Sequence, residues 1–322
     1  MHLHKIFPKA SFLRNMKYFT LIVFCFSLNF AIAQNTAGDA PIESELTFSD
    51  LESELTILGE KVVSGQKEED RLKANREFSQ LLESMLYEKE AFVYPFEKVK
   101  NLSKITAESG EFRIFSWLVP LKDGTFNYYG FALINSKKHG KDVVELSDKS
   151  GTLESPEYDW LKPEKWFGAI YYQTFEVKHK KKRYQIFLGY RPGNREVQEK
   201  LVEVMSLDGK KLTFGAKIFE TPVISDYKYE QRPYRLRFRY SKKVVASIKY
   251  KPELKMIVMD HLSPPDASMQ RDWKTYGPDF SYDGIYWENG KFYLKKQIEF
   301  NSGFKPPAPA EKPKQGLAPK KK

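Results

Sequence analysis

The sequence predicts an α+β protein: an N-terminal helical hairpin followed by a mainly antiparallel β domain, built as a sandwich or a distorted barrel. Apolar residues recur at helical spacing between residues 49 and 90, and from Phe112 they recur at every second position. Short turn sequences separate the β runs. Such short connections join antiparallel neighbours, because a parallel crossover needs about a dozen residues or more.

Residues 1–33 have the pattern of a signal peptide. A basic stretch ending at Lys17 precedes an uncharged run from Tyr18 to Ala33, which closes with the small residues of Ala31-Ile32-Ala33. This run of 16 residues is shorter than the ~20 that a bilayer span requires. We therefore expect an exported protein, periplasmic or extracellular, with no transmembrane span in the mature chain.

Residues 34–96 predict a polar linker and the helical hairpin. Ser49-x-x-Glu52 has the pattern of a capping box at a helix start. One apolar stripe follows at spacings of three and four, formed by Leu51, Leu55, Leu58 and Val62. The first helix should end near Gly65. The second is expected from about Glu68 to Glu90, with acids in its first turn, where the helix dipole favours negative charge.

Residues 97–304 predict the antiparallel β domain. Its strand-like runs cover residues 112–119, 126–134, 169–177, 184–190, 201–206, 211–219, 234–240, 244–250, 255–259, 284–287 and 291–300. Turns are expected at Asp123-Gly124, Pro192-Gly193, Asp208-Gly209 and Asn289-Gly290. A hairpin loop at Ser241-Lys242-Lys243 would pair Tyr240 with Val244. Residues 305–322, rich in proline and lysine, predict a disordered tail.

Composition excludes several classes of protein. The only cysteine, Cys25, lies in the signal segment, so the mature chain has no disulfide, cysteine nucleophile or thiolate metal ligand. The net charge of +11 is concentrated in residues 1–33 and 305–322, and the chain between them carries 43 basic and 41 acidic residues. A nearly balanced charge excludes nucleic-acid binding driven by a basic field.

The run 234–240 carries arginine on one of its faces. Strict alternation places Arg235, Arg237 and Arg239 together, opposite the apolar face. Guanidinium groups at intervals of about 7 Å repel one another unless anions neutralise them. Two sources of anions are open: internal carboxylates, of which Asp260 is the nearest expected, or the carboxylate or phosphate groups of a bound polymer.

Residues 260–284 combine unusual chemistry with little strand pattern, so we expect a long ordered loop. Loops of this length in a compact domain are usually functional or disordered. The candidate ligand-binding residues in this segment are Asp260, His261, Asp266 and Trp273. A histidine-dependent site would use His261, because the other two mature histidines lie in lysine-rich hairpin tips.

The same segment contains half of a calcium-loop pattern. Asp279-x-Ser281-x-Asp283-Gly284 supplies alternating oxygen ligands, but Gly290 stands where a bidentate glutamate is required. Turns capped by Asp279 and Asp283 are the competing interpretation. No cofactor other than this candidate calcium is expected. Common metalloprotease, nucleophile-elbow and nucleotide-binding motifs are absent from the sequence, and no catalytic residue is assigned.

Five strings resemble those of an uncharacterised family of secreted bacterial proteins with no known activity. They are FRIFSW (112–117), DGTFNYYGFALI (123–134), FGAKIF (214–219), DHLSPPD (260–266) and YGPDFSYDG (276–284). The resemblance spans about residues 94–300. It implies export and a shared fold, and it assigns a role to no residue.

Two functions follow as expectations. The leading one is a noncatalytic exported module, binding or structural, for an envelope or extracellular partner, with a glycan or anionic polymer expected before a protein. The alternative is a carboxylate-dependent hydrolase that uses the 260–284 loop. An enzyme should bring several acids with perturbed pKa together in one cleft, whereas a binding module should present a charged or aromatic surface.

Overall fold

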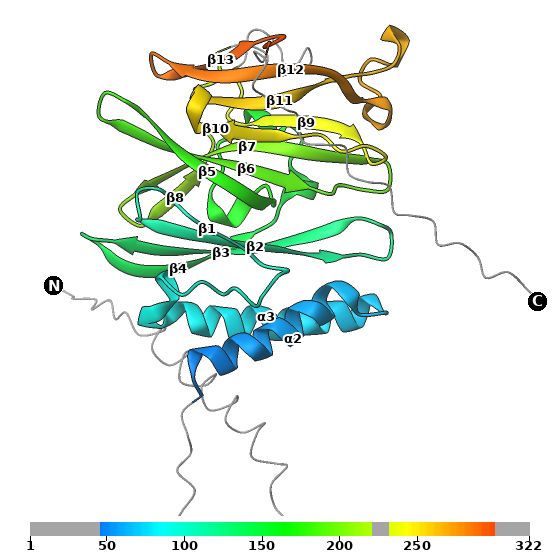
Figure 1. The fold of residues 1–322 in the computed structure, drawn as a ribbon. Coiled ribbons are helices and arrows are strands. Elements are labelled where there is room, and N and C mark those ends of the chain that lie inside the picture. The colour runs from blue at the N-terminus through cyan, green and yellow to red at the C-terminus, as the bar shows by residue number, and fades with distance from the viewer. Residues whose placement is uncertain (1–45, 221–231, 300–322) are drawn as a thin grey trace, which may run out of the picture. The chain divides into compact units, whose positions relative to one another are not determined.

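A computed structural model describes residues 46–220 and 232–299 (Figure 1). The predicted signal peptide and tail, and almost all of the predicted linker, lie outside the described residues. Within them, two α-helices precede three antiparallel sheets, which confirms the predicted α+β class. None of these three sheets closes into a barrel.

The helical hairpin consists of α2 (Phe48–Ser64) and α3 (Glu68–Tyr87). At the start of α2, the Thr47 hydroxyl accepts a hydrogen bond from the Asp50 amide, and the Asp50 carboxylate accepts one from the Thr47 amide. This reciprocal capping box satisfies two amides that the helix itself leaves unpaired. Gly65 ends the helix, as expected.

The predicted capping box at Ser49 and Glu52 is wrong. Glu52 is buried, and its carboxylate accepts hydrogen bonds from the Tyr94 hydroxyl and the Lys98 amide. Both Thr47-x-x-Asp50 and Ser49-x-x-Glu52 match the capping-box pattern, and the helix uses the first. Glu52 instead binds the segment that follows α3.

The first sheet has the strand order β1-β2-β3-β4. Its strands are β1 (Ser103–Thr106), β2 (Phe112–Pro120), β3 (Phe126–Ser136) and β4 (Gly140–Ser147). The predicted turn at Asp123-Gly124 joins β2 to β3, and Gly124 has the positive φ that favours glycine. The sequence did not predict β1 and β4, because these half-exposed edge strands lack a regular apolar alternation.

The second sheet is built around a long central strand, β7. Its members are β5 (Ile170–His179), β6 (Lys182–Arg191), β7 (Val197–Asp208), β8 (Lys211–Phe214) and β9 (Leu236–Ser241). β6 pairs with one edge of β7, while β8 and β9 pair with different parts of the other edge.

The predicted pairing of Tyr240 with Val244 is wrong. Tyr240 lies opposite Gln198, because β9 pairs with β7 and the following strand joins another sheet. The alternation along β9 is confirmed by the buried side chains Leu236, Phe238 and Tyr240. β7 is the better partner because it offers Glu199 to Arg237 of β9 and Glu203 to Arg235, the residue that precedes β9.

The third sheet has the order β10-β11-β12-β13. Its strands are β10 (Ile248–Lys251), β11 (Met256–Ser263), β12 (Gly277–Glu288) and β13 (Lys291–Lys295). The expected loop over residues 260–284 is therefore wrong at both ends, and residues 264–276 alone form the connection. Polar side chains obscured the strand pattern here, because they line a pocket instead of a core.

The helices and the three sheets lie in layers that follow the chain order (Figure 1). A separate apolar core fills each space between layers. Phe78 and Phe115 belong to the core between the helices and the first sheet. Trp166 and Phe187 belong to the core between the first and second sheets, and Ile257 to the core between the second and third sheets. The strands β9, β11 and β12, which carry the candidate site, therefore belong to the last two layers.

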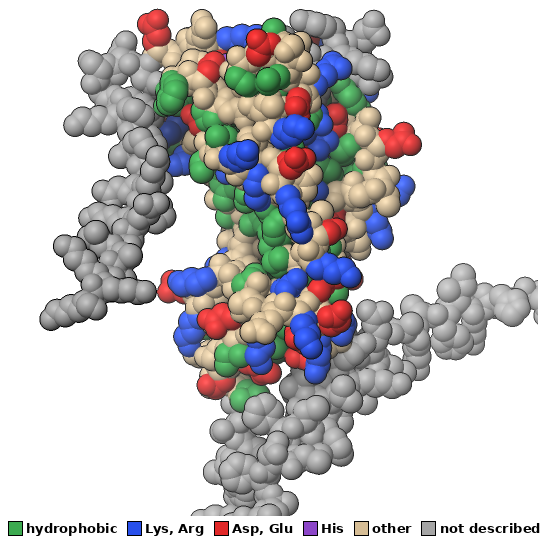
Figure 2. Space-filling view, turned by 90° about the vertical axis from the view of Figure 1, so that its right-hand side faces the viewer, with side chains coloured by type: hydrophobic (Ala, Val, Ile, Leu, Met, Phe, Trp, Pro, Cys, Tyr) green, Lys and Arg blue, Asp and Glu red, His purple; other side chains and the backbone are tan. Residues whose placement is uncertain are grey.

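The surface agrees with the balanced charge of the central sequence. Figure 2 shows Lys and Arg side chains mixed with Asp and Glu over one face of the molecule. Among the residues that the structure describes, no helix is both long and apolar enough to cross a bilayer.

Candidate functional site

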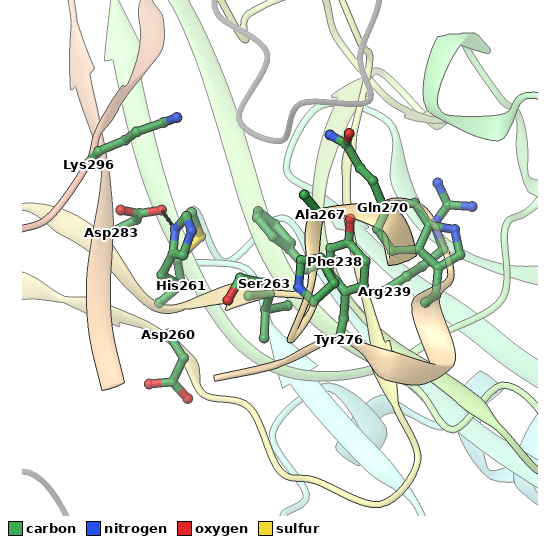
Figure 3. Close-up of a pocket in the computed structure, with 14 residues that line it drawn as sticks. Phe238, Arg239, Asp260, His261, Ser263, Ala267, Gln270, Tyr276, Asp283 and Lys296 are labelled. Carbon is green, nitrogen blue, oxygen red and sulfur yellow. Dashed lines mark hydrogen bonds and ion pairs between the residues drawn. The ribbon is translucent and has the colours of Figure 1, made fainter. Parts of the chain in front are cut away.

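A pocket of about 450 Å³ lies where the end of β9 meets β11, β12 and the connection between them (Figure 3). Its polar lining includes Arg239, Asp260, His261, Gln270, Asp283 and Lys296. In Figure 3, Arg239 and Gln270 lie at one end, while His261, Asp283 and Lys296 lie at the other. The pocket is therefore elongated, with a cation at each end.

Arg235 does not reach this pocket, because its side chain is completely buried. Its Nε atom donates to Glu203 Oε2 at 2.8 Å, and both side chains have an exposed fraction of 0%. Arg235 also donates to the backbone carbonyls of Pro156 and Asp159. Burial raises the pKa of the Glu203 carboxyl although Arg235 opposes this change. Arg235 is a structural residue of the second sheet.

Arg237 is also paired within the protein. Its Nε atom lies 2.8 Å from Glu199 Oε2, and its Nη1 atom lies 3.1 Å from Glu157 Oε2. The second oxygen of Glu199 pairs with Arg191 at 2.8 Å. Burial alone would raise the pKa of Glu199, but Arg237 and Arg191 outweigh it and lower that pKa. The two oxygens of Glu199 are thus bonded to Arg191 and Arg237.

Arg239 takes no part in the ion pairs formed by Arg191, Arg235 and Arg237. Its Cζ atom lies 4.3 Å from the centre of the Trp273 ring, an arrangement that favours a cation–π contact. Trp273 in turn packs against Tyr276, with ring centres 4.6 Å apart. Within the described residues, no carboxylate lies at ion-pair distance from Arg239, because Glu199, its cross-strand neighbour on β7, is bonded to Arg191 and Arg237. The aromatic pair therefore holds a guanidinium at the pocket wall with its donors available for a ligand.

His261 and Asp283 form the second polar centre. His261 Nδ1 lies 2.7 Å from Asp283 Oδ2, and the Asp283 side chain is almost fully buried while that of His261 is one-third exposed. Asp283 Oδ1 accepts the Gln297 amide. A carboxylate in this position holds the proton on Nδ1 and leaves Nε2 to accept. Asp279 Oδ2 lies 4.0 Å from Nε2, too far for a direct hydrogen bond.

Asp260 lines the pocket but points away from His261 (Figure 3). Its carboxylate accepts the Ser247 amide at 2.7 Å. Burial raises the pKa of Asp260. The acids of this segment therefore do not all converge on one point. Asp260 is also not the counter-ion of the arginine face, a role that belongs to Glu199 and Glu203.

The three residues proposed for calcium do not share a common centre. Asp279 Oδ1 accepts from the amide and the hydroxyl of Ser281, which is the turn that the competing interpretation expects. These hydrogen bonds and His261 lower the pKa of Asp279, although burial alone would raise it. Asp283 faces His261 instead. In the described ranges, no three acidic or histidine side chains are grouped to hold a metal ion.

Asp266 is outside the pocket lining. Its carboxylate accepts the Ser268 amide and caps the short 3₁₀ helix Ala267–Met269. This local role positions the connection between β11 and β12, from which Ala267 and Gln270 reach the pocket.

Sequence reasoning missed several residues that shape the site. Gln270, Tyr276 and Lys296 gave no signal in isolation, because only the fold brings them to the pocket. A signal did exist for Glu199 and Glu203. They lie on one face of β7 whose other residues are apolar, and buried acids require cationic partners.

The fold and the site together define a layered α+β protein with an elongated, cation-ended pocket at its third sheet. No protein-family model, curated protein or solved structure matches this chain.

Proposed function

We propose that the protein is an exported binding module whose pocket accepts an acidic segment of an envelope or extracellular glycan. The observation that supports it most is the unpaired Arg239, held over Trp273 at the pocket wall. Planar guanidinium donors match the two oxygens of a carboxylate, so a uronic acid is the ligand group of choice. Export is supported by the sequence pattern of residues 1–33.

The remainder of the lining suits a saccharide better than an apolar ligand. Gln270, His261 and Ser263 offer donors and acceptors to ring hydroxyls. Lys296, at the opposite end from Arg239, provides a second cation. A ligand that reaches both ends carries more than one acidic group, as an acidic polysaccharide does.

The test is binding of short oligomers of galacturonic, glucuronic and mannuronic acid, measured by calorimetry beside their neutral methyl esters. We expect binding of at least one acid form and none, or much weaker binding, of its ester. Lys296→Ala should weaken this binding and increase its tolerance to salt, because one ionic contact is lost. Lys295→Ala, which changes the neighbouring lysine outside the pocket lining, is the matched control. Equal binding of acid and ester would contradict the proposal.

The His261–Asp283 pair favours a second candidate function, a hydrolase acting on the same ligand. An imidazole oriented by a buried carboxylate is the arrangement of a general base. A water molecule between His261 Nε2 and the substrate would lose its proton to Nε2 as it attacks the glycosidic or ester carbon, and the leaving oxygen would receive that proton.

Release of reducing ends or acyl groups from the oligomers that bind distinguishes the two functions. A hydrolase should lose at least about 100-fold in rate in Asp283→Asn, with ligand affinity nearly unchanged. Asp272→Asn, which alters an exposed acid of the same connection, is the control. Binding without turnover in the wild-type protein would exclude hydrolysis of that ligand and leave the binding proposal intact.

A further inference from the structure

An irregularity in the third sheet lies directly beside the pocket. In the pairing of β11 with β12, Asp260 faces Tyr282 and Leu262 faces Pro278. His261 alone on β11 is therefore opposite three residues of β12, the bulge 279–281. Bulges commonly re-aim side chains next to functional sites. Here the bulge brings Asp279 toward His261 and directs its middle residue, Phe280, outward.

Phe280 combines two unfavourable features. Its φ of +70° lies in the left-handed region, where a bulky side chain meets a steric cost that glycine or asparagine avoids. Its side chain is 95% exposed, the largest exposed fraction among the large apolar residues described. Hydrogen bonds from Ser281 to Asp279 hold the turn in this conformation. The local structure thus maintains a strained backbone and presents an aromatic ring to solvent.

We propose that Phe280 is a stacking platform for a sugar ring of the same acidic glycan, outside the pocket. This inference rests on the proposed function and deepens it. Phe280 does not line the pocket, so a ligand that touches both must extend beyond one sugar unit. The ligand class is therefore an acidic oligosaccharide or polymer instead of a free uronic acid.

The surroundings of Phe280 fit a sugar better than a lipid or an apolar protein surface. The apolar face of a pyranose ring covers an aromatic ring, while its equatorial hydroxyls point sideways. Asp279 belongs to the same bulge and His261 is opposite it on β11, with side chains 39% and 34% exposed, so both can supply hydrogen-bond partners for those hydroxyls. A single isolated ring is too small an apolar surface for a stable protein interface or for insertion into a bilayer.

The experiment compares the wild-type protein with Phe280→Ala, Phe280→Trp and the control Val93→Ala. Val93 is 81% exposed and lies after the helical hairpin, away from the third sheet. Calorimetry measures the affinity for tetragalacturonate and for the galacturonate monomer, or for the acid series that the wild type prefers. Phe280→Ala should lose five- to tenfold in affinity for the tetramer with no change for the monomer, and Val93→Ala should change neither.

Phe280→Trp should retain tetramer binding and show a change in tryptophan emission on adding the tetramer but not the monomer. An unchanged tetramer affinity in Phe280→Ala would overturn the platform while leaving the Arg239-dependent pocket intact. An equal loss for monomer and tetramer would place Phe280 in the pocket's own structure and would also overturn it. If the wild type binds neither ligand, the proposed function fails, and the platform fails with it. A melting temperature equal to or above that of the wild type in Phe280→Ala shows that the variant is folded.

Discussion

Arg235, which directly precedes β9, and Arg239, which lies within it, have opposite surroundings. Arg235 and Glu203 are completely buried against each other, whereas Arg239 lies at the pocket wall over Trp273. Removing one member of a buried ion pair leaves the other charge uncompensated. We expect Arg235→Ala to lower the free energy of unfolding by about 3–5 kcal/mol. Arg239→Gln should lower it by about 1 kcal/mol or less.

Urea unfolding followed by circular dichroism measures both changes. The double variant Arg235→Met with Glu203→Leu is the informative control, because replacing a buried pair by apolar residues of similar size is often neutral. If Arg235→Ala leaves the free energy of unfolding unchanged, Arg235 has no structural role. The three arginines would then again be candidates for a ligand-binding surface.

At the start of α2 the structure chooses between two caps that the sequence offers. Thr47 forms the box with Asp50, and Ser49 has no capping role. Thr47→Ala should therefore lower the free energy of unfolding by about 1 kcal/mol, and Ser49→Ala should change it by a few tenths at most. Thermal melts of the two variants, recorded side by side, check this difference. A larger loss in Ser49→Ala would restore the cap predicted from the sequence.

The features that sequence analysis predicted correctly are local ones. Asn289-Gly290 joins β12 to β13 with positive φ at both residues, as the turn chemistry requires, and the alternation of β9 follows from side-chain spacing alone. The partner of β9 could not be predicted in this way. The run 244–250 and β7 both offer an apolar face to β9. The pairing with β7 depends on the carboxylates of Glu199 and Glu203, which lie more than 30 residues earlier in the chain.

The candidate site shows the same division. His261 and Trp273 were predicted because they lie in the chemically unusual segment 260–284, and both line the pocket. The bulge that places Asp279 near His261 depends on a shift in strand pairing, which no local pattern reveals. Lys296 follows the last strand and reaches the pocket only through the packing of the third sheet.

Across the described chain, hydrogen bonds and ion pairs lower the pKa of more carboxyls than burial raises. The pKa is lowered for Asp50, Asp123, Glu176, Glu199, Glu220, Asp266 and Asp279, and it is raised for Glu203 and Asp260. A group with a lowered folded pKa stabilises the fold above its unfolded pKa, and this contribution is lost as pH falls through the folded value. The two raised groups act in the opposite sense.

We therefore expect the melting temperature to be nearly constant from pH 7 to about 5 and to fall increasingly between about pH 4.5 and 3. Calorimetric scans over this range, at low and high salt, provide the measurement. The loss should persist in high salt, because Glu199 is buried and its ion pairs are weakly screened. A melting temperature that rises on acidification would show that Glu203 and Asp260 dominate instead.

The most direct test of the pocket assignment changes the ligand's carboxylate and Arg239, separately and together. Calorimetry gives the affinity of the wild-type protein and of Arg239→Gln for a uronic-acid oligomer and for its methyl ester. If Arg239 binds the carboxylate, the substitution should weaken the acid by about tenfold or more, near 1.4 kcal/mol, and leave the ester almost unaffected. An equal effect of Arg239→Gln on acid and ester, or no effect on either, would contradict the assignment.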